Sequence, residues 1–270
     1  MNRINLPPFT QRPSDSWRKC SPPLAVLILS IAASTGMLPA QSISVSNGSF
    51  ESPTPPQGFP VTVQVDSWQK TLQPAWFNPA DFQGVTWDQL SGAFPNTPQG
   101  QPDHIDNVDG DQAAYLFTLS EVGFTQELTE TYQAGMSYDL TVGILGGGGI
   151  VDGDSFLIGL YYLDAGNPVT IASTQITYSL ASFPTVTHLN DYSISLSDVQ
   201  VTDAWEGEQI GIELRSLVGT GSGYWDLDNV RLTAVPEPST LGLLAVGLGG
   251  GFLLARRNRS SRGGSSPDGK

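Results

Sequence analysis

The sequence predicts an all-β protein built as a jelly-roll-like two-sheet β-sandwich, flanked by an N-terminal signal segment and a single C-terminal transmembrane helix. Three observations lead to this prediction. Apolar and polar residues alternate with period two through much of residues 41–235, and Gly, Pro and Asn interrupt the pattern at short intervals. An uncharged apolar stretch stands near each end of the chain. No internal repeat indicates a propeller or a solenoid.

The first forty residues have the organisation of a signal peptide. Residues 24–33 form an apolar segment of suitable length, and Ala40 supplies the small residue expected before a cleavage site. The only cysteine, Cys20, precedes the apolar segment, so the exported domain after residue 40 has no thiol or disulfide chemistry. The basic segment that opens the signal contains Arg3, Arg12, Arg18 and Lys19.

Residues 41–235 are predicted to fold as one exported domain, because about 195 residues can build one sizeable core. Its strands are expected where apolar residues alternate with polar ones or where β-branched and aromatic residues gather. Glycine-rich stretches such as residues 146–149 and 219–223 separate them. The expected strands, in order, are residues 61–68, 114–119, 123–129, 138–144, 155–163, 169–174, 192–196, 210–215 and 225–233.

The exported domain is strongly acidic once the two ends are set aside. Residues 41–235 hold three cations, Lys70, Arg215 and Arg231, against twenty-three Asp and Glu, which leaves a net charge of −20. Cationic patches supply the affinity of proteins for nucleic acids and anionic membranes, so we expect neither as a partner. The balance suits neutral glycans, cation-rich surroundings or solubility alone.

The C-terminal segment combines a short motif, an apolar stretch and a basic cluster. Pro236, Glu237 and Pro238 lead into residues 239–255, which hold no charge. As a helix at 1.5 Å per residue this stretch is about 25 Å long, just enough for a single marginal membrane span. Arg256 and Arg257 follow it and are expected to stay cytoplasmic, which places the preceding domain outside. Residues 263–270 are expected to be a disordered tail.

This order of elements in residues 236–262 resembles the PEP-CTERM sorting signal. The resemblance implies that an exosortase, a membrane-embedded processing enzyme, recognises the Pro-Glu-Pro triplet after transient anchoring in the inner membrane. The domain would then reach the cell surface or the extracellular matrix, often in bacteria that build exopolysaccharide. The tail is also linked by name to ice-binding proteins. No regular Thr-x-Thr ladder is present, so we expect no ice-binding activity.

Two segments, residues 47–51 and 224–230, are similar to the first and last strands of jelly-roll carbohydrate-binding modules. The resemblance implies exopolysaccharide or another glycan as a partner, and a candidate structural calcium held by Glu51 and Asp228 together with backbone carbonyls. Trp225 and Leu227 share one face of the last expected strand, whereas Val230 falls in the opposite register, which predicts a bulge near Asp228. A bulge with a solvated Asp is the alternative.

Aromatic residues in the loop between residues 68 and 94 are the candidate glycan contacts. Trp76, Phe77 and Trp87 lie among Pro and Gly residues without strand or helix periodicity. A flat aromatic ring packs against the apolar face of a sugar, which makes these three residues a candidate binding surface. The alternative is that these aromatic side chains fold back onto the core as a lid.

Catalysis finds little support in the sequence, and we expect no enzyme. The only histidines are His104 and His188, and residues 219–223 lack the G-x-S-x-G spacing of a nucleophile elbow. Two carboxylates suffice for glycoside hydrolysis, so a glycoside hydrolase or lyase stays open as an alternative. A ligand-free structural component of the matrix is the other alternative to a glycan-binding surface protein.

Overall fold

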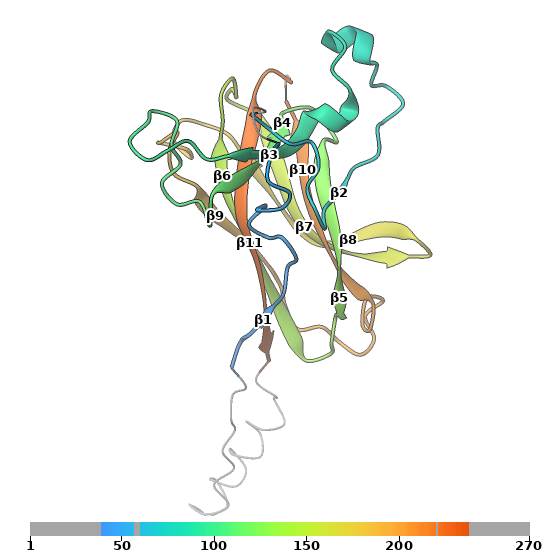
Figure 1. The fold of residues 1–270 in the computed structure, drawn as a ribbon. Coiled ribbons are helices and arrows are strands. Elements are labelled where there is room, and N and C mark those ends of the chain that lie inside the picture. Colours follow the sequence, from blue (N-terminus) through green and yellow to red (C-terminus); the bar gives the residue numbers. More distant parts are fainter. Residues whose placement is uncertain (1–38, 57–59, 220, 238–270) are drawn as a thin grey trace, which may run out of the picture. The chain divides into compact units, whose positions relative to one another are not determined.

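The computed structural model describes residues 39–56, 60–219 and 221–237, and there the chain forms two packed β-sheets (Figure 1). The predicted jelly-roll-like two-sheet β-sandwich is therefore confirmed. The expected transmembrane segment at 239–255, Pro238, the arginine cluster and nearly all of the signal segment lie outside the described residues. Within the described ranges, no helix has the length and apolar character needed to cross a membrane.

The first sheet has six strands and is centred on β11. The order is β3-β4-β11-β6-β9, and β1 pairs with the C-terminal part of β11 (Figure 1). All of these pairings are antiparallel. The strands are β1 (Gln41–Ile43), β3 (Ser91–Pro95), β4 (Gln112–Phe117), β6 (Met136–Gly146), β9 (Asn190–Leu196) and β11 (Tyr224–Pro236).

The second sheet has five antiparallel strands in the order β2-β5-β10-β7-β8. Two short 3-10 helices, η1 (Pro79–Phe82) and η2 (Trp87–Leu90), lie in the connection from β2 to β3. The strands are β2 (Gln69–Lys70), β5 (Gly123–Thr131), β7 (Ser155–Asp164), β8 (Asn167–Thr177) and β10 (Gln209–Val218).

The core lies between the two sheets, where the inward residues of each strand meet. On β10 the inward side chains of Ile210, Ile212 and Leu214 are fully buried, whereas the residues between them face outward, as period-two alternation predicts. On β11, Trp225 is fully buried, and its ring lies 5.6 Å from Phe156 and 5.7 Å from that of Phe183 (ring centroids). Trp225 therefore joins strands of both sheets.

The expected strand at residues 61–68 is wrong. Only Thr62 makes a ladder contact there, an isolated bridge to Ala93. Ser67 has a φ of 69°, a left-handed backbone that ends an extended run. Trp68 nevertheless packs inward, because its indole N–H donates to the Asn47 carbonyl at 3.0 Å and its ring stacks on Phe50. Packing of aromatic side chains, rather than strand pairing, explains the apolar character of this segment.

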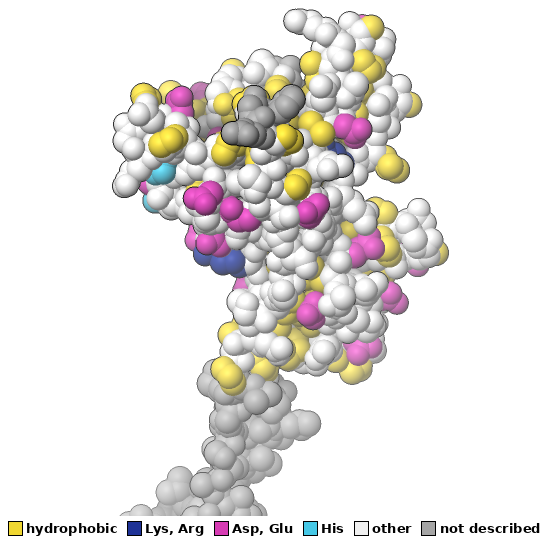
Figure 2. Space-filling view, in the orientation of Figure 1, with side chains coloured by type: hydrophobic (Ala, Val, Ile, Leu, Met, Phe, Trp, Pro, Cys, Tyr) yellow, Lys and Arg dark blue, Asp and Glu magenta, His cyan; other side chains and the backbone are white. Residues whose placement is uncertain are grey.

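The described surface reflects the acidic composition. Figure 2 shows Asp and Glu side chains spread over one face of the domain, whereas Lys and Arg side chains are sparse on it. One of the cations, Arg231, donates to Asp191 at 2.7 Å, and both side chains are about half exposed. Such an exposed pair contributes little to stability. Burial of the apolar core is therefore the main source of stability.

Substituting Trp225 by Ala is expected to lower the free energy of unfolding by about 3–5 kcal/mol, because the change leaves a large cavity where both sheets meet. Chemical denaturation of the exported domain measures this. Val201→Ala is the control, since that side chain is 78% exposed and should change stability by less than about 0.5 kcal/mol. Equal, small effects of both substitutions would contradict the assignment of Trp225 to the core.

Candidate functional site

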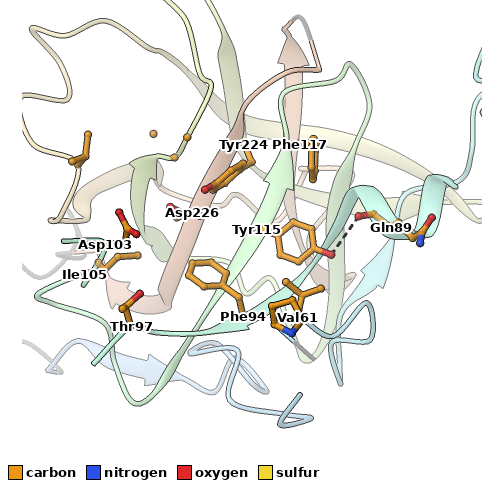
Figure 3. Close-up of a pocket in the computed structure, with 15 residues that line it drawn as sticks. Val61, Gln89, Phe94, Thr97, Asp103, Ile105, Tyr115, Phe117, Tyr224 and Asp226 are labelled. Carbon is orange, nitrogen blue, oxygen red and sulfur yellow. Dashed lines mark hydrogen bonds between the residues drawn. The ribbon is translucent and has the colours of Figure 1, made fainter. Parts of the chain in front are cut away.

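A cavity of about 750 Å³ opens on the outward face of the six-stranded sheet, over β3, β4 and β11. This volume lies in the range of pockets that enclose small organic molecules. Figure 3 shows aromatic rings from these strands around the hollow, with Asp226 between Tyr224 and Asp103 in this view. Among the residues that line the cavity, in the described part of the chain, there is no Lys or Arg.

Strand alternation places an aromatic wall and a carboxyl group side by side in the cavity. Because Trp225 points into the core, its neighbours Tyr224 and Asp226 point outward. In the antiparallel register, Tyr224 lies opposite Phe117 and Asp226 opposite Tyr115 on β4. The rings of Phe117 and Tyr224 are 6.1 Å apart between centroids. The pairing of two strands thus positions four side chains of the site.

Two glycines leave the room that these side chains occupy. A Cβ atom on Gly92 would collide with the Thr62 backbone carbonyl and lie 2.8 Å from the ring and hydroxyl of Tyr115. The Tyr115 hydroxyl donates to the Gln89 carbonyl at 3.3 Å (Figure 3). A Cβ atom on Gly147 would collide with the Tyr224 ring and lie 3.1 Å from Asp226 Oδ2. Side chains at these positions would displace both tyrosines and close off Asp226.

The opposite wall is a long loop between β3 and β4 that side-chain amides hold in place. Asn96 donates to the Ile105 carbonyl at 2.9 Å and accepts from the Ile105 N–H at 3.0 Å. Ile105 packs with Leu145 and Leu189 in a small second apolar cluster on the outward face of the sheet. The loop is thereby fixed over part of the outward face of the sheet.

Asp226 is a buried carboxyl group in these surroundings. Its side chain is 6% exposed, and within the described ranges no group donates a hydrogen bond to its buried Oδ1. Burial raises the pKa of Asp226 well above its ordinary value, because the charged form loses its hydration and gains no partner. The side chain therefore holds a proton at pH values at which an ordinary Asp is ionised. It is a proton donor that faces an aromatic cavity.

The candidate glycan contacts lie outside the cavity. Phe77 and Trp87 are 4% and 5% exposed, and the Trp87 indole N–H donates to the Thr71 carbonyl at 2.7 Å. Their rings pack against each other at 5.1 Å between centroids. Trp76 is 48% exposed, so it alone of the three keeps an open face. Glycan contact through Trp76, Phe77 and Trp87 stays a prediction, with Trp76 as the accessible residue.

The candidate calcium ligands Glu51 and Asp228 both accept hydrogen bonds from one loop, residues 109–112. Glu51 Oε1 accepts from the N–H groups of Asp111 at 2.9 Å and Gln112 at 2.8 Å, while Asp228 Oδ2 accepts from the Asp109 N–H. The loop of residues 109–112 thus holds both carboxylates. The predicted bulge is present, because the pairing of β11 with β6 shifts register between Asp228 and Arg231.

Asp228 has features of a cation ligand. Its side chain is fully buried, and its Oδ1 has no hydrogen-bond partner among the described residues. Burial, with the neighbouring charges of Asp109 and Glu51, raises its pKa to about 7. No group of three or more His, Cys, Asp or Glu side chains in the described ranges is arranged to hold a metal ion. Backbone carbonyls or water would therefore have to complete the shell that Glu51 and Asp228 begin.

No prediction from the sequence placed a cavity on the outward face of the sheet or singled out Asp226, although Asp226 lies within the expected strand at residues 225–233. The available signal was in residues 113–117, where Ala114 and Leu116 alternate with Tyr115 and Phe117, so that both faces of the strand are apolar. A strand that is apolar on both faces requires a cover on its outward side.

Comparison with known proteins identifies two segments of the chain. Residues 41–233 match the HpiC1 cyclase family, and residues 234–259 match the PEP-CTERM protein-sorting motif. The second match confirms the predicted sorting signal, which directs export through membrane anchoring and processing to the cell surface and implies processing by an exosortase. No curated protein matches the sequence. The family match contradicts the expectation that the domain is not an enzyme, since the family is one of cyclases.

Solved structures of similar fold agree with the family match. The Stig cyclase Fisc from Fischerella sp. TAU, in complex with (3Z)-3-(1-methyl-2-pyrrolidinylidene)-3H-indole, has a TM-score of 0.53 and 22% identity over 74% of this chain and 100% of that chain. A cyclase from Fischerella sp. TAU in complex with 4-(1H-indol-3-yl)butan-2-one has a TM-score of 0.54 and 22% identity, and the match covers 73% of this chain and 98% of that chain. A CBM4 structure has a TM-score of 0.36 and 12% identity over 72% of this chain and 100% of that chain, which is too dissimilar to support a conclusion.

The raised pKa of Asp226 makes the stability of the domain depend on pH. An unfolded Asp loses its proton near the ordinary value of 3.8, whereas folded Asp226 keeps it, so its stability contribution is full below that pH and is lost as the pH rises. Asn does not titrate, so the Asp226→Asn variant does not lose stability in this way as the pH rises. We expect the free energy of unfolding of the variant, relative to wild type, to increase as the pH rises above the ordinary Asp pKa of 3.8 in denaturation experiments. A difference that stays constant with pH would contradict the assignment.

Proposed function

Because the chain belongs to the HpiC1 cyclase family, we propose that it is an exported cyclase that closes a ring in an apolar small molecule by proton transfer from Asp226. The single observation that carries this proposal is the buried carboxyl of Asp226, whose pKa is raised by burial, in a cavity walled by Tyr115, Phe117 and Tyr224. A proton donor with a raised pKa is what acid catalysis near neutral pH requires.

The proposed reaction consists of two proton transfers with ring closure between them. Asp226 gives its proton to an electron-rich double bond or heteroatom of the substrate, and the cation that develops is attacked by a second double bond within the same molecule to form the ring. Loss of a proton from the product to the Asp226 carboxylate restores the acid. The reaction is therefore an isomerisation, in which substrate and product have the same mass. Asp226 is only 6% exposed, so the proton is transferred at a position that is largely shielded from bulk water.

The aromatic wall supports this reaction in two ways. The faces of Tyr115, Phe117 and Tyr224 attract a cation through their quadrupoles, by about 2 kcal/mol where it is desolvated. They also pack against flat apolar substrates. Because no Lys or Arg among the described residues lines the cavity, anionic substrates such as phosphate esters find no partner there. The indole ligands of the two Fischerella structures have this apolar, aromatic character, so a 3-substituted indole is our proposed substrate class.

Glycan binding is a second candidate, at a different surface. The observation that favours it is Trp76, whose ring is half exposed and braced edge-to-face by Phe77 and Trp87 at 6.1 Å each. A rigid exposed indole suits stacking on a sugar ring. This surface would hold the exported enzyme in an exopolysaccharide matrix while the cavity stays open. Retention of the domain on the polysaccharide of the producing cells, lost in Trp76→Ala, is the corresponding test.

The cyclase proposal predicts an isomer-forming activity that depends on Asp226. We expect the wild-type domain, incubated with the apolar small-molecule extract of its producing cells, to convert a compound into another of equal mass and different retention time. Asp226→Asn is expected to lower the rate by at least about 100-fold, the usual size of a lost general acid. Liquid chromatography with mass spectrometry measures both. Asp152→Asn, at an exposed loop position, is the matched control and should retain the rate.

Binding of a probe separates a failed reaction from a failed site. The probe 4-(1H-indol-3-yl)butan-2-one should bind the wild-type domain, and Gly147→Leu should weaken binding at least about tenfold because its side chain displaces Tyr224 and fills the cavity. Calorimetry measures this affinity. Equal affinity of both proteins, together with an Asp226→Asn rate equal to that of wild type, would rule out this cavity as the active site.

We also propose that Glu51 and Asp228 hold a structural calcium ion with backbone carbonyls. The unpartnered, fully buried Asp228 Oδ1 supports it, because a cation would stabilise the charged form. Calcium should raise the melting temperature relative to a chelator, and more at pH 8 than at pH 6, because a proton competes for Asp228 below its pKa of about 7. Glu51→Gln should reduce this shift, whereas Asp191→Asn should not. Identical melting with calcium and chelator would exclude the ion.

A further inference from the structure

The first two residues of the sorting triplet are part of the folded sandwich. Strand β11 runs through Pro236, which lies opposite Met136 at the start of β6. Glu237 follows, and its N–H donates to the Gly135 carbonyl at 2.8 Å. The Glu237 carboxylate accepts a hydrogen bond from the hydroxyl of Ser137. Glu237 therefore continues the ladder between β11 and β6 by one residue beyond the strand.

Neighbouring segments hold the groups that bind Glu237. The Ser137 side chain is 9% exposed, and its Oγ also accepts from the Asp198 N–H at 2.8 Å, which aims the hydroxyl hydrogen at Glu237. Gly135 has a φ of 78°, a conformation that favours glycine, and its N–H donates to the Val199 carbonyl at 2.8 Å. The turn before β6 and the residues that follow β9 thus form a small cradle for Glu237.

The cradle binds the two groups of the Pro-Glu-Pro triplet that a processing enzyme can recognise. Proline has no N–H group, so Glu237 carries the only backbone donor of the triplet and its only charge. Both groups are engaged by the domain. An enzyme that binds the triplet as an extended strand, or that pairs its carboxylate with a cation, needs the same two groups. The domain and the enzyme therefore compete for Glu237.

We propose that the folded domain masks the polar groups of the first two residues of its sorting triplet, Pro236 and Glu237, so that a processing enzyme gains access to them only after the end of β11 peels away from β6. The masked groups are the Glu237 N–H and carboxylate, and the masking groups are the Gly135 carbonyl and the Ser137 hydroxyl. Glu237 remains at the surface, so the segment opens locally without unfolding of the core. The rate of processing is then set in part by this local opening.

The position of the cavity fits a domain that works while it is tethered. Asp226 lies ten residues before Pro236 on β11, which corresponds to about 30 Å along a strand. The chain enters the sandwich at Gln41, opposite Ala234, close to the point where it leaves at Glu237. The cavity therefore lies toward the other end of β11 from Pro236 and Glu237. A domain that is still attached through its C-terminal segment can thus keep the cavity accessible.

Hydrogen exchange of the full-length wild-type chain in detergent tests the mask directly. The Glu237 amide should exchange more slowly than the unstructured rate, and Ser137→Ala should exchange there roughly threefold to tenfold faster, the effect of one lost hydrogen bond. Ser195→Ala is the matched control, because Ser195 donates to the carboxylate of Asp139 on the same sheet and does not contact the triplet. A wild-type Glu237 amide that exchanges at the unstructured rate overturns the proposal.

Processing in the producing cells provides the second readout. Immunoblots after a pulse of synthesis should show faster conversion to the clipped form for Ser137→Ala than for wild type and Ser195→Ala. A short Gly-Ser insertion between Val235 and Pro236 moves the intact triplet off β6 and should accelerate conversion in the same way, which covers the case that Ser137→Ala folds poorly. Equal conversion rates for wild type, Ser137→Ala and the insertion overturn the proposal even if the amide is protected.

Discussion

The antiparallel pairing of β11 with β4 on one side and β6 on the other is the constraint on which the rest of the structure depends. It gives β11 a fixed orientation, with Trp225 in the core and Asp226 in the cavity. Because side chains on a strand alternate between faces, burial of Trp225 leaves Asp226 no other direction. The bulge after Asp228 then re-aims the remaining residues of the strand, so Leu232 again faces the core.

This arrangement carries an energetic cost that the fold offsets elsewhere. A carboxyl group without a partner is unfavourable inside a protein, and it avoids the larger cost of a buried charge by keeping its proton. The fully buried Trp225 and the residues around it contribute the stability that allows Asp226 to remain buried. Asp226→Asn removes the acid and leaves a side chain of nearly the same size. A destabilising group retained in a cavity is typical of a functional site.

The sequence predicted the architecture well because alternation and turn residues are local signals. The strands around Leu140, Ile158 and Ile212, the bulge after Asp228 and the approach of Glu51 to Asp228 are all in the structure. The pairing of β11 with β4 is non-local, and no local pattern shows that Asp226 and Tyr115 are neighbours. The expected strand at 61–68 was wrong because its apolar residues make non-local packing contacts, such as that of Trp68 with Phe50, instead of pairing in a sheet. The expectation of no enzyme was wrong because it rested on the missing nucleophile motif, whereas the carboxyl of Asp226 is set apart by its burial, which no local pattern shows.

Asp226, as a neutral acid in an aromatic cavity, is the group on which the proposed chemistry depends. Infrared spectroscopy measures this directly, because a protonated carboxyl group has a carbonyl stretch that a carboxylate lacks. The difference spectrum between wild type and Asp226→Asn, recorded just above the ordinary Asp pKa of 3.8, isolates the contribution of Asp226, because all other carboxyl groups are common to both proteins. The account predicts a protonated carboxyl band in wild type that disappears in the variant. A spectrum that shows only carboxylate bands for Asp226 would contradict it.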